Sequence, residues 1–304
     1  MEQPRDVVNV ENVPAATTLD PVPVTTARRI SFVRAFRHRS LAAGSVICLV
    51  IVAVVLAAPL LASVDPNTQD PAAAFSPPSS GRLMGADAFG RDLLSRVLYG
   101  GRTTILASVG VVLIGGTVGT ALGVVAGYFG KATGFIIMRG VDLLLAFPGI
   151  LLALAVAAVL GTGLSNGVIA VAVILVPVYA RMVEGATAEI LHMPYVQAAI
   201  TVGAGPWHVI RRHILPNVAS GIIVLTTSWL GIASLWIAAL GFIGLGVQPP
   251  TPEWGAILND GQNYITLAWW ITLFPGTFLA LFVVAVNLIG DGLRDELDPT
   301  LNRR

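Results

Sequence analysis

Four charged residues of alternating sign, Asp87, Arg91, Asp92 and Arg96, lie within ten positions of one another. Arg91 follows Asp87 by four positions, and Arg96 follows Asp92 by four, so each pair would share one face of a helix. Such a segment can neutralise itself through local ion pairs, or it can present its charges to a substrate or a partner. The spacing alone leaves both readings open.

Asp142 is the next residue whose position has chemical consequences, because it falls inside an apolar stretch with Arg139 three positions before it. Ionisable residues deep in apolar helices serve proton- and ion-driven transporters. An isolated Asp at the centre of a membrane helix would cost about 2.5–3.5 kcal/mol, whereas an Asp paired near the end of the helix costs far less. The spacing therefore favours a structural ion pair, with a functional acid as the alternative.

Other chemistry finds little support. Gly130-Lys131 lacks the earlier glycine and the following Ser or Thr of a phosphate-binding loop. Cys48 is the single cysteine, and His208 and His213, five positions apart, should point to different faces of a helix rather than share a metal. We therefore expect no catalytic residue, no metal site and no cofactor in this chain.

The composition indicates a membrane protein. The 304 residues are 55% hydrophobic and 12% charged, whereas soluble domains carry about 25% charged residues. An ordinary soluble enzyme and a largely disordered chain are excluded. The net charge of +1 offers no basic field for nucleic acid.

Six apolar stretches have about the length needed to cross the hydrocarbon core of a bilayer, roughly 20 residues. They are Gly44–Val64, Thr103–Tyr128, Phe135–Leu160, Asn166–Val183, Gly221–Leu245 and Ala268–Leu293. The second contains Gly119 and Gly123, a spacing that lets a neighbouring helix approach closely. The sequence therefore predicts an all-α integral membrane protein with six packed transmembrane helices.

Basic residues predict the orientation of the chain. If the N-terminus is cytoplasmic, all but four of the 18 Lys and Arg residues fall on that side, as cytoplasmic segments require. Both termini are therefore expected in the cytoplasm, with residues 1–27 as a disordered tail. Residues 28–102 would hold the first span and an external amphipathic helix at Asp92–Leu98, and residues 103–304 the core transmembrane domain.

The stretch 184–220, between the fourth and fifth spans, predicts two short cytoplasmic helices. The apolar positions of the first recur at i, i+3, i+4 and i+7, at Tyr195, Ala198, Ala199 and Val202. Gly203 and Gly205 permit a left-handed stop, and Pro206 suits the first turn of a second helix. This hairpin either docks a partner or simply lies on the membrane surface.

Two prolines fall inside predicted spans, Pro148 in the third and Pro275 in the sixth. A proline removes a helix hydrogen bond and can bend the helix. These positions are candidates for the flexing of a gate, and equally for simple packing.

The hairpin resembles the EAA loop of bacterial ABC importer permeases, whose pattern is E-A-A, three further residues, a glycine, and later I-x-L-P. This chain matches that pattern at Ala198, Ala199, Gly203, Leu215 and Pro216. It departs at Gln197, where Glu is usual, and at His213, which takes the place of Ile. In that family the loop docks on a separate ATPase subunit. The resemblance implies ATPase coupling through Tyr195, Gln197, Ala198, Ala199, Gly203, Gly205, Leu215 and Pro216.

Three longer stretches resemble, in order, the signatures of the C-type permease of dipeptide/oligopeptide importers. They read G-A-D-A-F-G-R-D-L-L-S-R from residue 85, L-G-F-I-G-L-G-V-Q-P-P-T-P-E-W-G from residue 240, and G-D-G-L-R-D-E-L-D-P from residue 290. Ala86 replaces the usual Thr. Together the resemblance covers about residues 31–300.

That resemblance implies a type I ABC importer permease in the bacterial cytoplasmic (inner) membrane, forming half of a pathway for dipeptides or oligopeptides. Its partners would be a B-type permease, two ATPase domains that carry ATP and Mg, and an extracytoplasmic substrate-binding protein. Residues implied in external docking or substrate admission are Asp87, Arg91, Asp92, Arg96 and Trp254. Alternatives are an importer of nickel, glutathione or sugars, an ion-driven secondary transporter, or a membrane scaffold that transports nothing.

Overall fold

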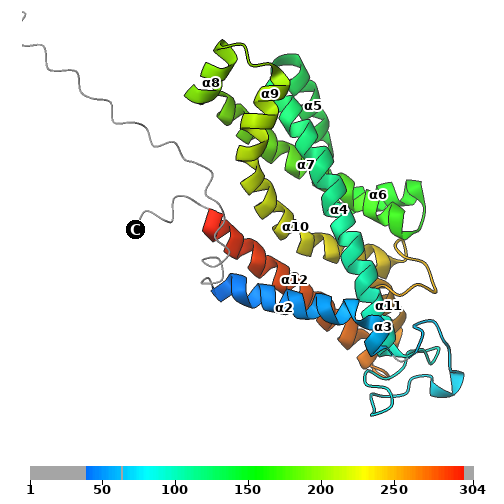
Figure 1. The fold of residues 1–304 in the computed structure, drawn as a ribbon. Helices are drawn as coiled ribbons and strands as arrows, with labels where there is room; N and C mark the ends of the chain where they lie inside the picture. Colours follow the sequence, from blue (N-terminus) through cyan, green and yellow to red (C-terminus); the bar gives the residue numbers. More distant parts are fainter. Residues whose placement is uncertain (1–38, 63, 298–304) are drawn as a thin grey trace, which may run out of the picture. The chain divides into compact units, whose positions relative to one another are not determined.

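The computed structural model describes residues 39–62 and 64–297, all within one unit spanning 31–304 (Figure 1). The predicted tail, residues 1–27, lies outside the described residues, as do Asp298 and Pro299 at the end of the C-terminal motif. Five helical segments are long and apolar enough to cross a membrane, and a bent helix pair would make a sixth span. The all-α fold with up to six spans is therefore confirmed. The five segments contain α2 (Arg39–Leu56), α4 (Leu93–Phe129), α7 (Leu164–Leu191), α10 (Leu215–Ile243) and α12 (Trp270–Leu297).

Helix α4 is longer at its N-terminal end than predicted. The expected separate amphipathic helix at Asp92–Leu98 is wrong, because these residues cap and begin the 37-residue α4. Gly100 and Gly101 lie inside this helix and make room for a neighbour. A Cβ on Gly101 would lie 2.7 Å from the Trp254 ring.

The third predicted span is not one straight helix. It is divided into α5 (Lys131–Leu145) and α6 (Gly149–Leu160), whose axes are bent by 95°. Pro148 caps α6 with an extended backbone, φ −55° and ψ 128°. A proline disfavours helical backbone at the residue before it, so the chain must leave the helix here.

The fifth span begins earlier than the predicted Gly221. Helix α9 (Pro206–Val209) passes through a π-helical turn, η3 (Ile210–Ile214), into α10, so that 206–243 is one continuous helical segment. Pro216 lies in the first turn of α10 without ending it. The wider i→i+5 bonding of the π-turn accompanies this proline; the Leu215 amide bonds to the Ile210 carbonyl.

Shorter elements complete the fold. They are α3 (Ala58–Leu61), η2 (Pro71–Ala73), α8 (Pro194–Thr201), α11 (Trp254–Gly261) and η4 (Gln262–Tyr264). In Figure 1, α2 lies along α12. Two glycines allow this approach: a Cβ on Gly44 would lie 2.7 Å from the Ala285 carbonyl oxygen, and one on Gly292 would lie 2.6 Å from the Leu41 Cβ.

The main helix contact joins α4 to α7 through glycines four residues apart on α4. A Cβ on Gly119 would lie 2.5 Å from the Val176 carbonyl oxygen, and one on Gly123 would lie 2.6 Å from the Ala180 carbonyl oxygen. The predicted small-residue contact is therefore confirmed. It extends in both directions, to Gly115 and Gly127.

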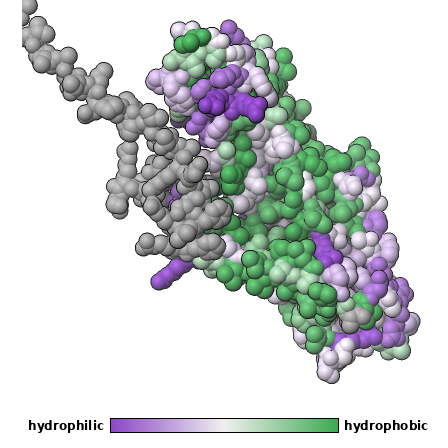
Figure 2. All heavy atoms as spheres, viewed as in Figure 1, coloured by the Kyte–Doolittle hydropathy of each residue, from purple (hydrophilic) through white to green (hydrophobic). Residues whose placement is uncertain are grey.

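Hydropathy follows the arrangement of the helices. Figure 2 shows apolar residues over the middle of the visible face and hydrophilic residues gathered near α8–α9 and at the opposite end. Many large apolar side chains are exposed, including Leu113 and Leu143. This distribution is expected where lipid or another membrane subunit covers the surface.

Candidate functional site

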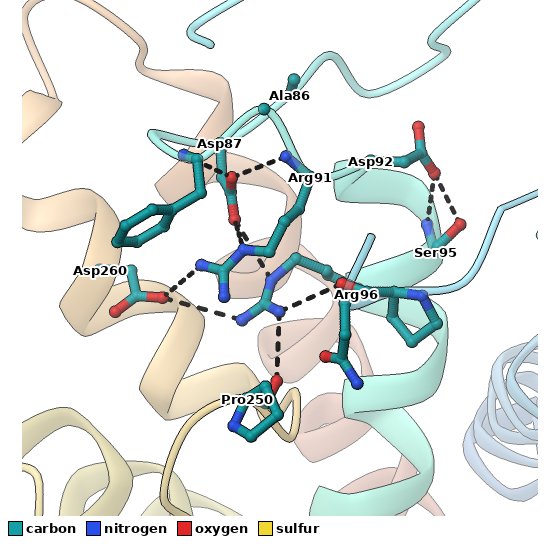
Figure 3. Close-up of polar contacts among 12 residues, drawn as sticks. Ala86, Asp87, Arg91, Asp92, Ser95, Arg96, Pro250 and Asp260 are labelled. Carbon is teal, nitrogen blue, oxygen red and sulfur yellow. Dashed lines mark hydrogen bonds and ion pairs between the residues drawn. The ribbon is translucent and has the colours of Figure 1, made fainter. Parts of the chain in front are cut away.

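The loop before α4 and the first turns of α4 carry a buried charge cluster (Figure 3). The Nε of Arg91 donates to the Oδ2 of Asp87 at 2.5 Å, which confirms the predicted i, i+4 pair. The backbone amides of Phe89 and Arg91 donate to the other oxygen of Asp87. Only 2% of Asp87 and 5% of Arg91 is exposed, so this is a structural centre rather than a surface feature.

Arg96 enters the same cluster from α4. The predicted pairing of Arg96 with Asp92 is wrong: the Nε of Arg96 lies 3.4 Å from the Oδ2 of Asp87. Asp92 instead caps α4, where one oxygen accepts from the Ser95 amide and hydroxyl. The helix starts immediately after Asp92, so that carboxylate is used by the free amides of the first turn.

Asp260, on α11, was missed from the sequence. Its Oδ2 lies 3.2 Å from the Nη2 of Arg91 and 3.7 Å from the Nη2 of Arg96. Two carboxylates thus face two guanidinium groups. No local motif signalled Asp260, because it lies far along the chain from its partners.

Trp254 and its neighbour Glu253 connect this cluster to the helix bundle. Trp254 is fully buried and donates from its indole to the Val97 carbonyl oxygen at 2.9 Å. Glu253, also fully buried, accepts from the Thr104 hydroxyl at 2.7 Å and from the Ala256 amide at 2.9 Å. Burial raises the pKa of the Glu253 carboxyl. Glu253 too was missed, and the N-cap position before α11 is the one signal that marks it.

The predicted hairpin between the fourth and fifth spans has the expected form. Helix α8 is anchored by Val196, which is fully buried, while Tyr195 is 46% and Val202 88% exposed. Ala198 is exposed and Ala199 is half-buried. The predicted apolar face therefore points largely away from the bundle. Within the described residues, nothing covers it.

The turn after α8 is made by one glycine rather than two. Gly203 has φ +96°, as predicted for a left-handed stop, whereas Gly205 has φ −70° and caps α9. Pro206 begins α9 as expected. Gln197 donates from its amide to the Leu191 carbonyl oxygen at 2.6 Å, which ties α8 to the end of α7.

The π-turn changes one sequence expectation. The rings of His208 and His213 were predicted on different helix faces, but their centroids lie 6.0 Å apart. A helix that bonds i to i+5 brings residues five apart onto one face. Even so, no group of three metal-ligand side chains occurs among residues 39–62 and 64–297.

Asp142 is paired, as expected. Arg139 lies 3.7 Å away on the same helix, and Arg181 of α7 makes a closer contact with the other oxygen. The Arg181 contact was not predicted. It joins α5 to α7 by an ion pair with partly exposed side chains.

The two candidate gate prolines have different settings. Pro148 lies at the 95° bend between α5 and α6. Pro275 lies inside α12, which continues past it. Their role in gating stays a prediction.

Comparison with known proteins decides the family. A family model described as "Binding-protein-dependent transport system inner membrane component" matches residues 119–303. The chain belongs to this family. A second model, "N-terminal TM domain of oligopeptide transport permease C", matches residues 28–78. The resemblance to C-type ABC importer permeases is therefore confirmed.

Curated relatives match over most of their length. The chain is 42% identical to a di/tripeptide transport system permease protein of Pseudomonas aeruginosa, over 96% of this chain and 98% of the relative. It is 44% identical to a probable D,D-dipeptide permease protein of Escherichia coli (84% and 86%) and 46% identical to a glutathione permease protein of Pectobacterium atrosepticum (74% and 74%). This binding-protein-dependent permease is thus a multi-pass inner-membrane protein of an ABC importer, and ATP binding lies with partner ATPases.

A solved structure shares the fold. An inward-facing methionine ABC transporter matches with a TM-score of 0.53 at 20% identity, over 66% of this chain and 96% of that chain. At this identity the likeness concerns the fold alone.

Proposed function

We propose that this permease forms half of the pathway of a peptide importer of the dipeptide/oligopeptide class. The names of its relatives carry the substrate class, since di/tripeptide and dipeptide permeases match most of the chain. A related B-type permease would form the other half. A substrate-binding protein would deliver peptide from outside, and two ATPase domains would bind inside, with both termini of this chain.

The feature that supports ATPase coupling is the exposed apolar face of α8. Tyr195 and Val202 project from a short helix that the buried Val196 holds to the bundle. A groove on an ATPase can bury such a face, as amphipathic helices are bound elsewhere. Residues 184–220 would serve as the coupling segment between the two spans.

Helix continuity would carry a movement of α8 into the membrane. Beyond the Gly203 turn, α9 and η3 run directly into α10, where Leu215 and Pro216 lie. On the other side Gln197 bonds to the end of α7. A displacement of α8 therefore acts on both spans, and the Pro148 and Pro275 positions are where α6 and α12 would bend.

The charge cluster would act indirectly at the external side. Asp87, Arg91, Arg96 and Trp254 are buried, so they would set the shape of the loop that meets the binding protein. Asp92, half-buried at the start of α4, is nearer the surface. This division assigns the cluster a positioning role and leaves direct contact to the exposed residues of the loop.

Reconstituted complex tests the proposal. The permease, co-purified with its partners, is placed in vesicles, and uptake of labelled dipeptide is measured with and without ATP and binding protein. We expect uptake only with both. Gly203→Pro should abolish uptake while ATP hydrolysis and membrane insertion persist. Gly140→Ala, in open space on α5 and outside the 184–220 segment, is the matched control. Uptake without ATP, or driven by an ion gradient, would instead identify a secondary transporter.

Glutathione is the second candidate cargo, because two glutathione permease relatives match 74% of the chain. A competition experiment distinguishes a dipeptide importer from a glutathione importer. Unlabelled glutathione in excess should leave dipeptide uptake unchanged if the peptide assignment is right. Strong competition, together with uptake of labelled glutathione, would replace it.

A further inference from the structure

A groove of about 530 Å³ lies between α4 and α10 and reaches α9. Val112, Val124 and Ile222 are among its apolar lining residues, and Trp207 lies where it meets α9. Figure 2 shows apolar residues between α4 and α10, beside hydrophilic residues over α9 and the turn that follows it. The groove therefore joins a hydrocarbon-like surface to a polar one.

Two of the three threonines that line the groove make hydrogen bonds within the chain. The hydroxyl of Thr117 donates to the Leu113 carbonyl oxygen at 2.6 Å, and the hydroxyl of Thr226 lies 3.0 Å from that of Tyr179. With these hydrogen bonds made inside the chain, Thr117 and Thr226 present mainly their methyl groups, and the hydroxyl of Thr120 is the remaining polar side-chain group on the α4 wall. Such a lining suits hydrocarbon and disfavours a charged or zwitterionic solute.

The length of the groove suits a lipid chain. Its α4 lining runs from Val112 to Val125, which is about 20 Å at 1.5 Å per residue. That is about a third more than one leaflet, or half, of a hydrocarbon core of about 30 Å. A single acyl chain can therefore lie along it.

Arg211 stands at the polar end. It follows Trp207 by four positions and precedes Leu215 by four, and both of these line the groove. Helical spacing places all three on one side of the α9–η3 segment. Arg211 is exposed, and no ion pair with it occurs among the described residues. Arg212, equally exposed, falls one residue further round.

We propose that a phospholipid with an anionic headgroup occupies this groove, with an acyl chain between α4 and α10 and its phosphate at Arg211. A guanidinium matches the geometry of a phosphate, and indole rings favour the level of the headgroups. Basic residues at the ends of membrane helices bind anionic lipids. The proposal rests on the membrane-permease family and not on the peptide assignment.

A photoactivatable lipid tests the site in the whole importer complex. Complex in phosphatidylcholine vesicles receives a trace of phosphatidylglycerol carrying a diazirine in its acyl chain, and labelled peptides are mapped after illumination. A phosphatidylcholine probe with the same chain is the headgroup control. We expect the anionic probe to label peptides covering 112–125 and 215–226 several-fold more than the neutral probe.

Two matched charge variants sharpen the test. Arg211→Gln should lower labelling by the anionic probe about fivefold, as expected for losing one cation at the membrane surface. Arg212→Gln removes the same charge from the adjacent face and should leave it little changed. Ala121→Phe, which fills the groove, should reduce labelling by both probes. Thermal unfolding of each purified complex verifies that the variant folds.

Three outcomes would overturn the proposal. Equal labelling by both probes would mean that bulk lipid alone reaches the groove. Equal losses from Arg211→Gln and Arg212→Gln would mean diffuse surface charge rather than a site. Absence of lipid label, with cross-links from the groove to another subunit, would mean that a protein segment occupies it.

Discussion

Arg91 and Asp260 lie 169 positions apart in the chain, yet the Nη2 of Arg91 is 3.2 Å from the Oδ2 of Asp260. The same carboxylate oxygen lies 3.7 Å from Arg96. The contact ties the loop before α4 to α11, so this loop and the helix leading to α12 are joined by charge as well as by packing. Trp270, at the start of α12, adds a hydrogen bond to the Ala86 carbonyl oxygen.

The two carboxylates of this cluster should differ sharply in their contribution to stability. Asp87→Asn leaves two nearly buried guanidinium groups without their main counter-charge, and removing one partner of a buried pair costs about 3–5 kcal/mol. Asp260 has a side chain that is 37% exposed, so Asp260→Asn should cost about 1 kcal/mol or less. The unfolding temperatures of complexes carrying Asp87→Asn or Asp260→Asn give the comparison. Equal losses would mean that the two carboxylates contribute equally, and a larger loss from Asp260→Asn would make Asp260 the principal counter-ion.

Close packing of α4 on α7 predicts intolerance at Gly119. A Cβ there would lie 2.5 Å from a carbonyl oxygen of α7. Because a backbone atom cannot move aside as the end of a flexible side chain can, Gly119→Ala should lower the free energy of unfolding by about 1–3 kcal/mol. Gly140 lies inside α5 with nothing within 4 Å. Gly140→Ala should be neutral or stabilising by roughly 0.5–1 kcal/mol. Matching unfolding temperatures for the two variants would argue against a tight α4–α7 interface.

Hydropathy and spacing predicted the membrane class, the spans and the α8 hairpin, since these depend on local composition. The positions at which the helices begin and end were harder to predict. Helix α4 runs through Gly101, and the Trp254 ring that requires a small residue there comes from a distant part of the chain. The helix continues through Pro216 because a π-turn precedes it, and no residue pattern predicts that turn.

The charge cluster also shows which contacts a single sequence does not predict. The i, i+4 rule found the Asp87–Arg91 pair but misassigned Arg96, because Asp92 was already committed to the N-terminus of α4. Asp260 and Glu253 become visible as functional candidates only when α11 is placed against α4. Long-range pairing of this kind is decided by packing, and a single sequence does not contain it.

Gly203 and Gly205 should respond differently to the same methyl group. A Cβ added at either position would have no atom within 4 Å, so neither substitution creates a steric clash. Gly203 has φ +96° and Gly205 φ −70°, and strain at the first should cost about 1–3 kcal/mol. Gly203→Ala should therefore speed hydrogen exchange at the Ala204 amide, which bonds across the turn to Ala199, by about tenfold or more.

Exchange measured by mass spectrometry on the intact complex gives the comparison. Gly205→Ala should leave the protection of the turn as it is in the parent protein. Similar acceleration in both variants would show that the turn does not depend on the left-handed conformation of Gly203.

Glu253 should make the stability of the bundle near α11 sensitive to pH. Burial raises its pKa above the ordinary value of 4.5, so the folded protein holds the proton more tightly than the unfolded chain does. The stability that this provides is fully present below pH 4.5 and is lost as the pH rises through the raised pKa. The unfolding temperature of the complex, measured from pH 4.5 upward, should fall across that window.

In the variant Glu253→Gln, which keeps a carbonyl oxygen for the Thr104 hydroxyl, this fall in unfolding temperature should be smaller. Asp65→Asn removes an exposed carboxyl from the loop between α3 and α4 and should keep the shape of the parent curve. If the Glu253→Gln curve ran parallel to the Asp65→Asn curve, the buried carboxyl would not be the source of the pH dependence.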